Sequence, residues 1–248
     1  MRFARFFAAL AAVLLAAGRA LAAETKVAVA ANFTEPAKEI AARFKARTGH
    51  DAVLSFGSSG QFYAQIANGA PFEVFLSADR ERPEKADAER LSVAGSRFTY
   101  AVGRLVLYSK TPGLVDARGA VLRSGRFEKI AIADPKTAPY GVAALETMRR
   151  LGVEAALRPK LVQGTSITQA YQFVDTGAAE LGFVALSQVA SVTGGSRWVV
   201  PAANHTPIDQ QAVLLKTGAN AAAARAFMTF LKGPEAKAII KKYGYEVP

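Results

Sequence analysis

Cysteine is absent from this 248-residue chain, and histidine occurs only twice. Without cysteine there can be no disulfide, no thiolate nucleophile, no cysteine-ligated metal and no lipoprotein anchor. The two histidines, His50 and His205, are far apart, and neither has partner residues at metal-ligand spacing. We therefore interpret both as surface or loop residues and expect no metal bound directly by side chains.

Long apolar runs and basic clusters are also missing from most of the chain. After residue 22 no stretch is long and apolar enough to form a transmembrane helix. Lysine and arginine outnumber aspartate and glutamate by 31 to 20, a net charge of +11, but they are scattered along the sequence. No basic stripe with interleaved aromatics occurs, so nucleic-acid binding is not expected. A diffuse positive field is compatible with attracting small anions.

The first 22 residues have the pattern of a secretory signal peptide. Arg2 and Arg5 precede an apolar stretch at 6–17, and Ala20-Leu21-Ala22 is an A-x-A cleavage site. The apolar stretch is too short to span a bilayer comfortably. We expect cleavage near Ala22 and export to a bacterial periplasm. About 226 residues would remain, with a net charge of +8 once Arg2, Arg5 and Arg19 are removed, enough for one large domain or two small lobes.

Strand-like and helix-like segments alternate along the mature chain. The predicted strands are 26–30, 52–56, 72–76, 98–108 (broken at Gly103), 129–133, 161–162, 181–185 and 212–215. The predicted helices are 33–44, 61–68, 80–90, 142–151, 163–174, 221–232 and 234–242. Strands separated by helices predict an α/β protein with mostly parallel sheets and right-handed crossovers.

The pattern divides into two successive α/β units, followed by helices alone. The C-terminal helices would most simply pack back against the first unit, so the chain would cross between units near 100–104 and near 209–212. We therefore expect lobe I at 23–103 plus 212–248 and lobe II at 104–211, with two crossover strands at the hinge. A cleft between such lobes is where open α/β sheets bind ligands.

Four loops follow a strand and begin a helix: 31–33, 57–60, 138–141 and 164–167. The first N–H groups of a helix have no internal partner, and each helix start carries about half a positive charge. If all four loops face one cleft, their dipoles sum to about +2, which suits a dianion. The glycines allow close backbone approach, and Ser58 and Ser59 add hydroxyl donors.

Each of these residues also has a purely structural explanation. A Gly/Ser loop with a serine N-cap is common, and Asn32 could cap the helix that follows it. Tyr140 could be a packing aromatic at the lobe boundary, and Ile167 a core residue that acts only through its N–H. Asp134 invites a general-base interpretation, but an aspartate before proline is an ordinary turn signal.

Several short motifs together resemble one known family. They are Val-Ala-Ala-Asn-Phe at 29–33, Ser-Phe-Gly-Ser-Ser-Gly at 55–60, Gly-Ala-Pro at 69–71, Leu-Ser-Ala-Asp at 76–79, Ala-Asp-Pro at 133–135, Lys-Gly-Pro at 232–234 and Tyr-Gly-Tyr at 243–245. The combination is similar to that of periplasmic molybdate-binding proteins, the substrate-binding components of molybdate ABC importers. The resemblance covers essentially the whole mature chain.

The resemblance implies a two-lobed periplasmic-binding-protein fold, type II-like, that closes around molybdate or tungstate. It implies ligand contacts from Asn32 and Ser59 through side chain and backbone N–H, and from the N–H groups of Tyr140 and Ile167. Ala31 and Ser58 would flank them. It further implies a monomer that delivers the oxyanion to a membrane permease, with no cofactor, no catalytic activity and no metal other than that of the oxyanion.

The chain departs from the family pattern at three positions. Several members have serine where this chain has Asn32 and a small residue where it has Tyr140, and many have a tyrosine donor where it has Ala185. The Tyr140 phenol is one replacement for that donor.

Two other functions are compatible with parts of the sequence. The same fold could bind sulfate, phosphate or an organic anion, although the four loops lack an aspartate that would accept from protonated phosphate. An exported hydrolase could use Ser58 or Ser59 as its nucleophile. Gly57-Ser58-Ser59-Gly60 is not a G-x-S-x-G elbow, however, and only His50 and His205 are available as an imidazole base.

Overall fold

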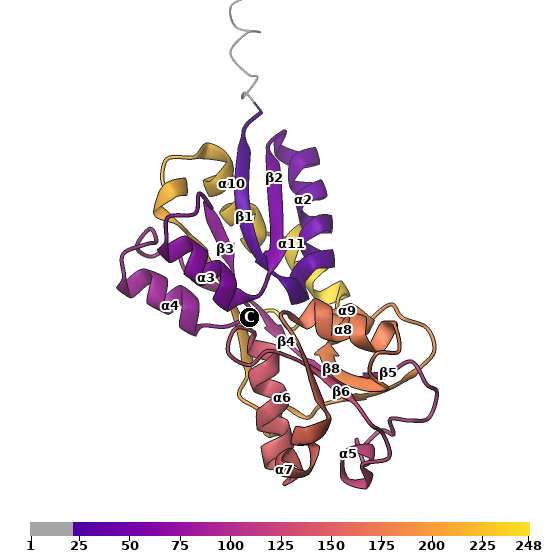
Figure 1. Cartoon of the computed structure of the whole chain (residues 1–248). Coiled ribbons are helices and arrows are strands. Elements are labelled where there is room, and N and C mark those ends of the chain that lie inside the picture. Colours follow the sequence, from indigo (N-terminus) through magenta and orange to yellow (C-terminus); the bar gives the residue numbers. More distant parts are fainter. Residues whose placement is uncertain (1–21) are drawn as a thin grey trace, which may run out of the picture.

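The chain folds into two α/β lobes, each built on a five-stranded sheet (Figure 1). The computed structural model describes residues 22–248. The predicted signal peptide, apart from its last position, lies outside the described residues. Within the described part, no helix combines the length and apolarity needed to cross a membrane. The predicted two-lobed α/β architecture is confirmed.

The sheet of the first lobe has the strand order β2-β1-β3-β10-β4. Its strands are β1 (Glu24–Ala30), β2 (Asp51–Gly57), β3 (Val74–Leu76), β4 (Phe98–Gly103) and β10 (Ile208–Leu214). β1 pairs in parallel with β2 and β3, whereas β10 is antiparallel to β3 and β4. The loops that follow β1 and β2 therefore belong to the parallel half of the sheet. The antiparallel half contains β10, the strand that returns from the second lobe.

The sheet of the second lobe repeats this plan, with the order β7-β6-β8-β5-β9. Its strands are β5 (Leu105–Ser109), β6 (Ile130–Ala133), β7 (Leu161–Gly164), β8 (Leu181–Ala185) and β9 (Ser196–Val199). β6 is parallel to β7 and β8, and β5 is antiparallel to β8 and β9. Each lobe thus has a mixed sheet, because the strand that enters from the other lobe runs against its neighbours.

Helices cover both sheets. The longer ones are α2 (Thr34–Thr48), α3 (Ser59–Ala67), α4 (Glu81–Ala88), α6 (Pro139–Arg150), α8 (Ile167–Asp175), α10 (Ala222–Lys232) and α11 (Pro234–Lys242). Single turns form α5 (Val121–Ser124), α7 (Glu154–Leu157), α9 (Leu186–Val189) and the 3-10 turn η1 (Ala31–Phe33). As predicted, the C-terminal helices return to the first lobe, where Phe227 and Ile240 share a core with Val27 and Phe44.

The lobes are joined where β4 passes into β5 and where the chain runs from β9 into β10. The predicted strand 98–108 is in fact two strands in different sheets, separated at Arg104. A third segment reaches this junction, because Glu246 pairs with Val102 beside β4, and the chain end lies between the lobes (Figure 1). β10 enters the first sheet at Ile208; the division of the chain at 103/104 and 211/212 stays a prediction.

Candidate functional site: a chamber between the lobes

The four predicted loops meet in one chamber between the lobes. η1 and the start of α3 supply the first-lobe wall, and the starts of α6 and α8 supply the second-lobe wall. The chamber is narrow, with a cavity volume of about 10 Å³, close to the space that one water molecule needs. The lining residues are Ala30, Ala31, Asn32, Gly57, Ser58, Ser59, Ala78, Ala138, Pro139, Tyr140 and Ile167. The structure therefore brings together Asn32, Ser59, Tyr140 and Ile167, with Ala31 and Ser58 beside them.

Ser58 and Ser59 have different surroundings although both are buried. The Ser59 hydroxyl accepts a hydrogen bond from the Ala78 backbone N–H at 2.9 Å, which leaves its own hydrogen available. The Ser58 N–H donates to Gln61 Oε1 at 3.5 Å, but Ser58 Oγ has no hydrogen-bond partner within residues 22–248. A buried hydroxyl without a partner is costly, so Ser58 is a marked exception on the chamber wall.

Asn32 is held by a network beneath the chamber and does not cap the next helix. Its side-chain N–H groups donate to Gln210 Oε1 at 2.8 Å and to the Tyr245 hydroxyl at 2.9 Å. Its backbone carbonyl accepts from Tyr245 and from Ser187, each at 2.7 Å. The interpretation of Asn32 as a helix cap is wrong, because α2 has no side-chain cap. With both amide hydrogens engaged, the backbone N–H is the Asn32 donor that remains for a ligand.

Tyr140 contributes its backbone to the chamber while its ring extends toward the hinge. The Tyr140 hydroxyl accepts from Gln210 Nε2 at 3.3 Å, and it fills space beside Gly103 that a side chain there would need. The hydroxyl of Tyr100 donates to Gln210 Oε1 at 3.0 Å from the other side. Gln210 is thus the centre of a fully buried neutral network that joins Asn32 in the first lobe to Tyr140 in the second.

Burial further favours the neutral form of the tyrosine hydroxyls in this network. Burial raises the pKa of the Tyr245 hydroxyl to about 12, and it raises the pKa of Tyr100 and of Tyr140 well above the ordinary value. All three phenols are therefore neutral hydrogen-bond donors at physiological pH.

No charged side chain lines the chamber within residues 22–248. Its positive character comes from backbone N–H groups at helix starts, where Ser59, Tyr140 and Ile167 occupy the first turns of α3, α6 and α8. Ser166 caps α8 by accepting from the Gln169 N–H at 3.3 Å. Fixed N–H groups of this kind can replace the hydration shell of an anion.

The two histidines and Asp134, which were considered as metal ligands or as a general base, lie outside the chamber. His50 accepts from the Ala23 N–H at 3.2 Å and packs near Phe44, whereas His205 is partly exposed beyond β9. Asp134 forms a turn in which its side chain accepts from the Lys136 N–H at 2.9 Å. In the described part of the chain no group of three or more potential metal ligands occurs.

The roles of Gln210, Tyr100 and Ser187 were not predicted from the sequence, and Tyr245 was recognised only as part of the motif at 243–245. The available signal was polarity in an apolar context, since Gln210 and Gln211 lie within strand β10 beside an apolar run and both are buried. Sequence offered no indication that Asn32 would meet residues 178 and 213 positions away.

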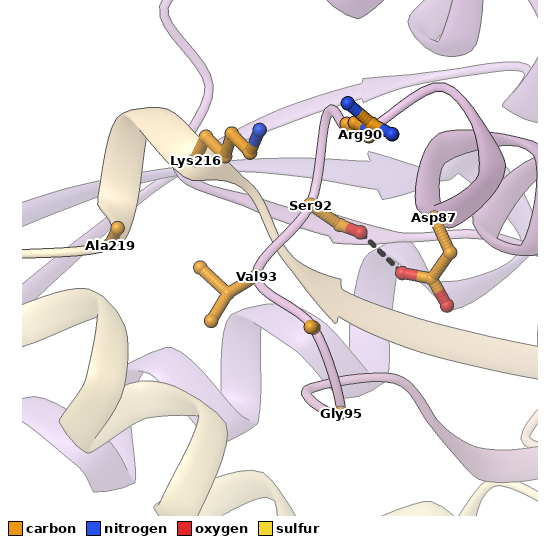
Figure 2. A pocket seen from close by; sticks show the side chains of 8 residues that line it. Asp87, Arg90, Ser92, Val93, Gly95, Lys216 and Ala219 are labelled. Carbon is orange, nitrogen blue, oxygen red and sulfur yellow. Dashed lines mark hydrogen bonds between the residues drawn. The ribbon is translucent and has the colours of Figure 1, made fainter.

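A larger hollow lies on the first lobe (Figure 2), and no residue of the four loops lines it. It is lined by Asp87, Arg90, Ser92, Val93, Ala94, Gly95, Lys216 and Ala219. Its polar groups are partly used internally, because the Ser92 hydroxyl donates to the Asp87 carboxylate (Figure 2). None of the predicted ligand residues borders it.

Comparison with known proteins gives the family. The model for bacterial extracellular solute-binding proteins matches residues 25–246. The chain belongs to this family. Among curated solute-binding proteins, it is 61% identical over 237 residues to the molybdate-binding protein ModA of Rhodobacter capsulatus, covering 96% of this chain and 94% of that protein. It is 57% identical over 244 residues to ModA of Azotobacter vinelandii, covering 97% and 96%.

A solved structure of a solute-binding protein shares the fold. The periplasmic molybdate-binding protein of Azotobacter vinelandii superposes with a TM-score of 0.87 at 47% sequence identity, over 90% of this chain and 99% of that one. The likeness therefore spans both lobes and the junction between them.

Proposed function

We propose that this protein binds molybdate, and also tungstate, in the chamber between its lobes and delivers the oxyanion to the permease of an ABC importer. The observation that carries the proposal is the single uncharged chamber where four helix starts from both lobes converge. Its support is the near full-length similarity to proteins named as molybdate-binding.

The proposed ligand contacts come from both walls. In the first lobe they are the backbone N–H of Asn32 and the N–H and hydroxyl of Ser59, flanked by Ala31 and the unpartnered hydroxyl of Ser58. In the second lobe they are the N–H groups of Tyr140 and Ile167. Hydrogen bonds from neutral donors to an ionised acceptor are shorter and stronger than neutral pairs, so this set can hold a dianion.

Selectivity is proposed to follow from size and from donor-only chemistry. Molybdate and tungstate are larger than sulfate, so a cage that fits them leaves sulfate too far from some donors. A protonated phosphate needs an acceptor for its hydrogen, and the chamber walls carry no carboxylate. The ligand is cargo, and no resident cofactor is part of the proposal.

A transport role also explains the serines better than hydrolysis does. A serine nucleophile needs an adjacent base, and the Ser59 hydroxyl meets the Ala78 N–H while neither histidine borders the chamber. We propose a non-enzymatic periplasmic monomer, with lobe I at 23–103 plus 212–248 and lobe II at 104–211.

Isothermal titration calorimetry with molybdate, tungstate, sulfate and phosphate tests the proposal. Tight binding of molybdate and tungstate, with much weaker binding of sulfate and phosphate, is the expected result. A rise in melting temperature with the same ligands should accompany it, because a ligand that binds only the folded state stabilises that state. Sulfate binding equal to or tighter than molybdate binding would refute the assignment. Turnover of an ester substrate that Ser59→Ala abolishes would instead support a hydrolase.

A further inference from the structure

A backbone hydrogen bond joins the two lobes at the edge of the chamber. The Gly60 N–H, in the first turn of α3, donates to the Thr137 carbonyl at 2.9 Å. Gly60 directly follows Ser59, and Thr137 directly precedes the loop that presents Tyr140. Neither Gly60 nor Thr137 lines the chamber. The bond therefore connects two ligand-presenting loops from opposite lobes without touching the ligand space.

The contact leaves no room for a side chain at position 60. A Cβ built on Gly60 would lie 2.9 Å from Thr137 Cα and 3.0 Å from the Thr137 carbonyl oxygen. Both are backbone atoms, so they cannot swing aside as the end of a flexible side chain could. The turn that carries them is fixed by Asp134, whose backbone carbonyl accepts from the N–H groups of Thr137 and Ala138.

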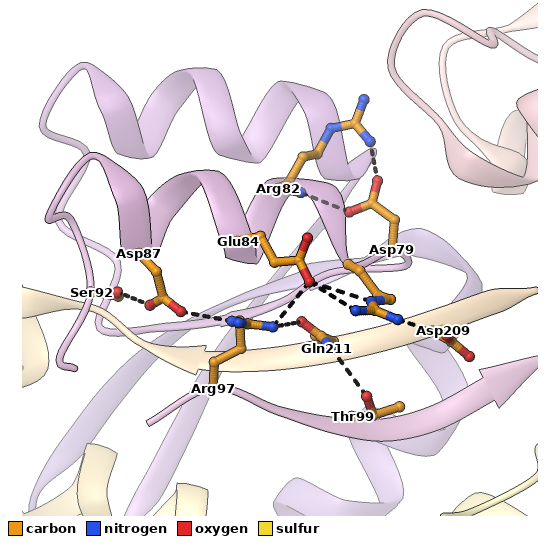
Figure 3. Close-up of polar contacts among 10 residues, drawn as sticks. Asp79, Arg82, Glu84, Asp87, Ser92, Arg97, Thr99, Asp209 and Gln211 are labelled. Atoms are coloured by element: carbon orange, nitrogen blue, oxygen red, sulfur yellow. Dashed lines mark hydrogen bonds and ion pairs between the residues drawn. The ribbon is translucent and has the colours of Figure 1, made fainter. Parts of the chain in front are cut away.

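Arg82 makes a second contact from the first lobe to the same turn. Its guanidinium donates to the Lys136 carbonyl at 3.4 Å and forms an ion pair with Asp79 (Figure 3). Asp79 is itself held by the Ser77 hydroxyl at 2.9 Å. The Arg82 side chain is only 16% exposed, which is low for an arginine at a lobe boundary.

We propose that Gly60 and Arg82 form a clasp on the turn 134–138 that holds the lobes closed, and that Gly60 is a positioning residue for ligand affinity. At the start of α3, the Ser59 N–H is then directed to the ligand, whereas the Gly60 N–H bonds to the opposite lobe. This inference rests on the proposed function, because closure affects affinity only if the ligand is held between the lobes.

The substitution Gly60→Ala separates closure from folding. Gly60 is helical and its φ is not positive, so alanine fits its backbone and favours the helix over glycine. The added methyl meets backbone only when the lobes close. We expect an unliganded melting temperature equal to or above that of the wild type, together with molybdate affinity lower by about tenfold or more, as for an overpacked contact.

The experiment combines calorimetry, stopped-flow dissociation and small-angle X-ray scattering on the mature wild-type and variant proteins with molybdate. Gly60→Ala should release molybdate faster and contract less on binding than the wild type. Gln65→Ala, at an exposed position on the same helix, is the matched control and should match the wild type. Arg82→Met, which keeps an unbranched apolar stem but removes the guanidinium donors, should weaken binding by a smaller factor.

The outcomes distinguish the clasp from the proposed function. If the wild type does not bind molybdate, the proposed function fails. If the wild type binds and Gly60→Ala shows the same affinity, dissociation rate and contraction, the clasp is refuted. Should Gly60→Ala fold poorly, unchanged affinity and dissociation in Arg82→Met would refute it instead.

Discussion

Two networks lie side by side along strand β10, and they differ in charge. Gln210 belongs to the network under the chamber, where it contacts Asn32, Tyr100 and Tyr140, and its side chain is fully buried. The next residue, Gln211, faces the other network, where its side-chain oxygen accepts from Arg97 at 2.8 Å (Figure 3). Successive residues of a strand point to opposite faces, so one dipeptide serves both.

The second network is ionic and reaches solvent. Arg97 pairs with Asp87 at 2.7 Å and Glu84 at 3.3 Å, and Arg80 pairs with Glu84 at 3.2 Å (Figure 3). These charges satisfy one another and remain partly exposed, so their individual contributions to stability are small. Among the described residues, the ionised side chains are therefore kept off the chamber wall, which carries neutral dipoles. A fixed charge in a dry chamber would dominate the energy of a bound dianion.

The largest effect is expected when a charge is placed inside the uncharged chamber. Ser59→Asp puts a carboxylate where the proposed dianion binds, and like charges at low dielectric repel strongly. We expect molybdate binding to be abolished in calorimetry at neutral pH. Ser59→Ala, the neutral control, should lose about 10- to 100-fold in affinity, the range for a hydrogen bond to a charged group. Equal losses in the two variants would show that charge is not what the chamber excludes.

A matched pair of substitutions compares the two networks directly. Gln210→Leu leaves the Asn32 amide and the Tyr100 hydroxyl buried without their acceptor, and we expect it to lower the free energy of unfolding by about 2–4 kcal/mol. Gln211→Leu removes a partner of the half-exposed Arg97 and should cost about 1 kcal/mol or less. Urea unfolding measures both, and calorimetry should show weaker molybdate binding only for Gln210→Leu. A reversed order would contradict the assignment of the two networks.

The Ser58 hydroxyl tests whether its missing partner is the ligand. Since Ser58 Oγ has no partner in residues 22–248, Ser58→Ala removes a buried unsatisfied group, so the unliganded protein should be as stable as the wild type or more so. Molybdate affinity should fall by about tenfold, near the lower value for a hydrogen bond to an anion. Differential scanning fluorimetry and calorimetry give the two readouts. A variant that loses stability but keeps affinity would make Ser58 a structural residue.

Sequence allowed the chamber walls to be predicted because each wall is a local feature. A strand followed by Gly57-Ser58-Ser59-Gly60 and a helix predicts a helix start at the sheet edge, and the same reasoning located 138–141 and 164–167. That all four loops share one space follows from two lobes facing each other. The short strand β9, which follows Gly194-Gly195, escaped detection because four residues carry little periodic signal.

The support beneath the chamber could not be predicted, since it depends on contacts across the whole chain. The neighbours of Asn32 along the chain favoured a helix cap at this residue, and the family resemblance implied a ligand contact through its side chain and backbone N–H. Its amide is instead engaged by Gln210 and Tyr245, which only the returning strand and the C-terminal segment bring near. The direction of the Tyr140 ring likewise depends on the absence of a side chain at Gly103.

Alkaline pH should lower the free energy of unfolding through the neutral network and not through the ionic one. Near neutral pH the expected effect is small. Burial raises the pKa of Tyr245 to about 12, above its ordinary value of 10.0, so the unfolded chain loses this proton before the folded one does. The stabilisation is fully present below pH 10 and is lost as pH rises from about 10 toward 12, because the unfolded state then binds fewer protons. The ionic network around Arg97 contains no tyrosine, so this loss of a phenol proton concerns the neutral network alone.

Urea unfolding at intervals from pH 8 to 11.5 measures this slope. Up to pH 10, we expect tyrosine ionisation to leave the free energy of unfolding unchanged. Above pH 10 the free energy should fall, and it should fall less steeply for Tyr245→Phe, which has no phenol proton to lose. Arg97→Ala, which removes the centre of the ionic network, should lower stability by a similar amount at every pH and leave the slope unchanged. If Tyr245→Phe shows the wild-type slope, the buried phenol does not control alkaline stability, and the distinction between the two networks would then rest on their charge alone.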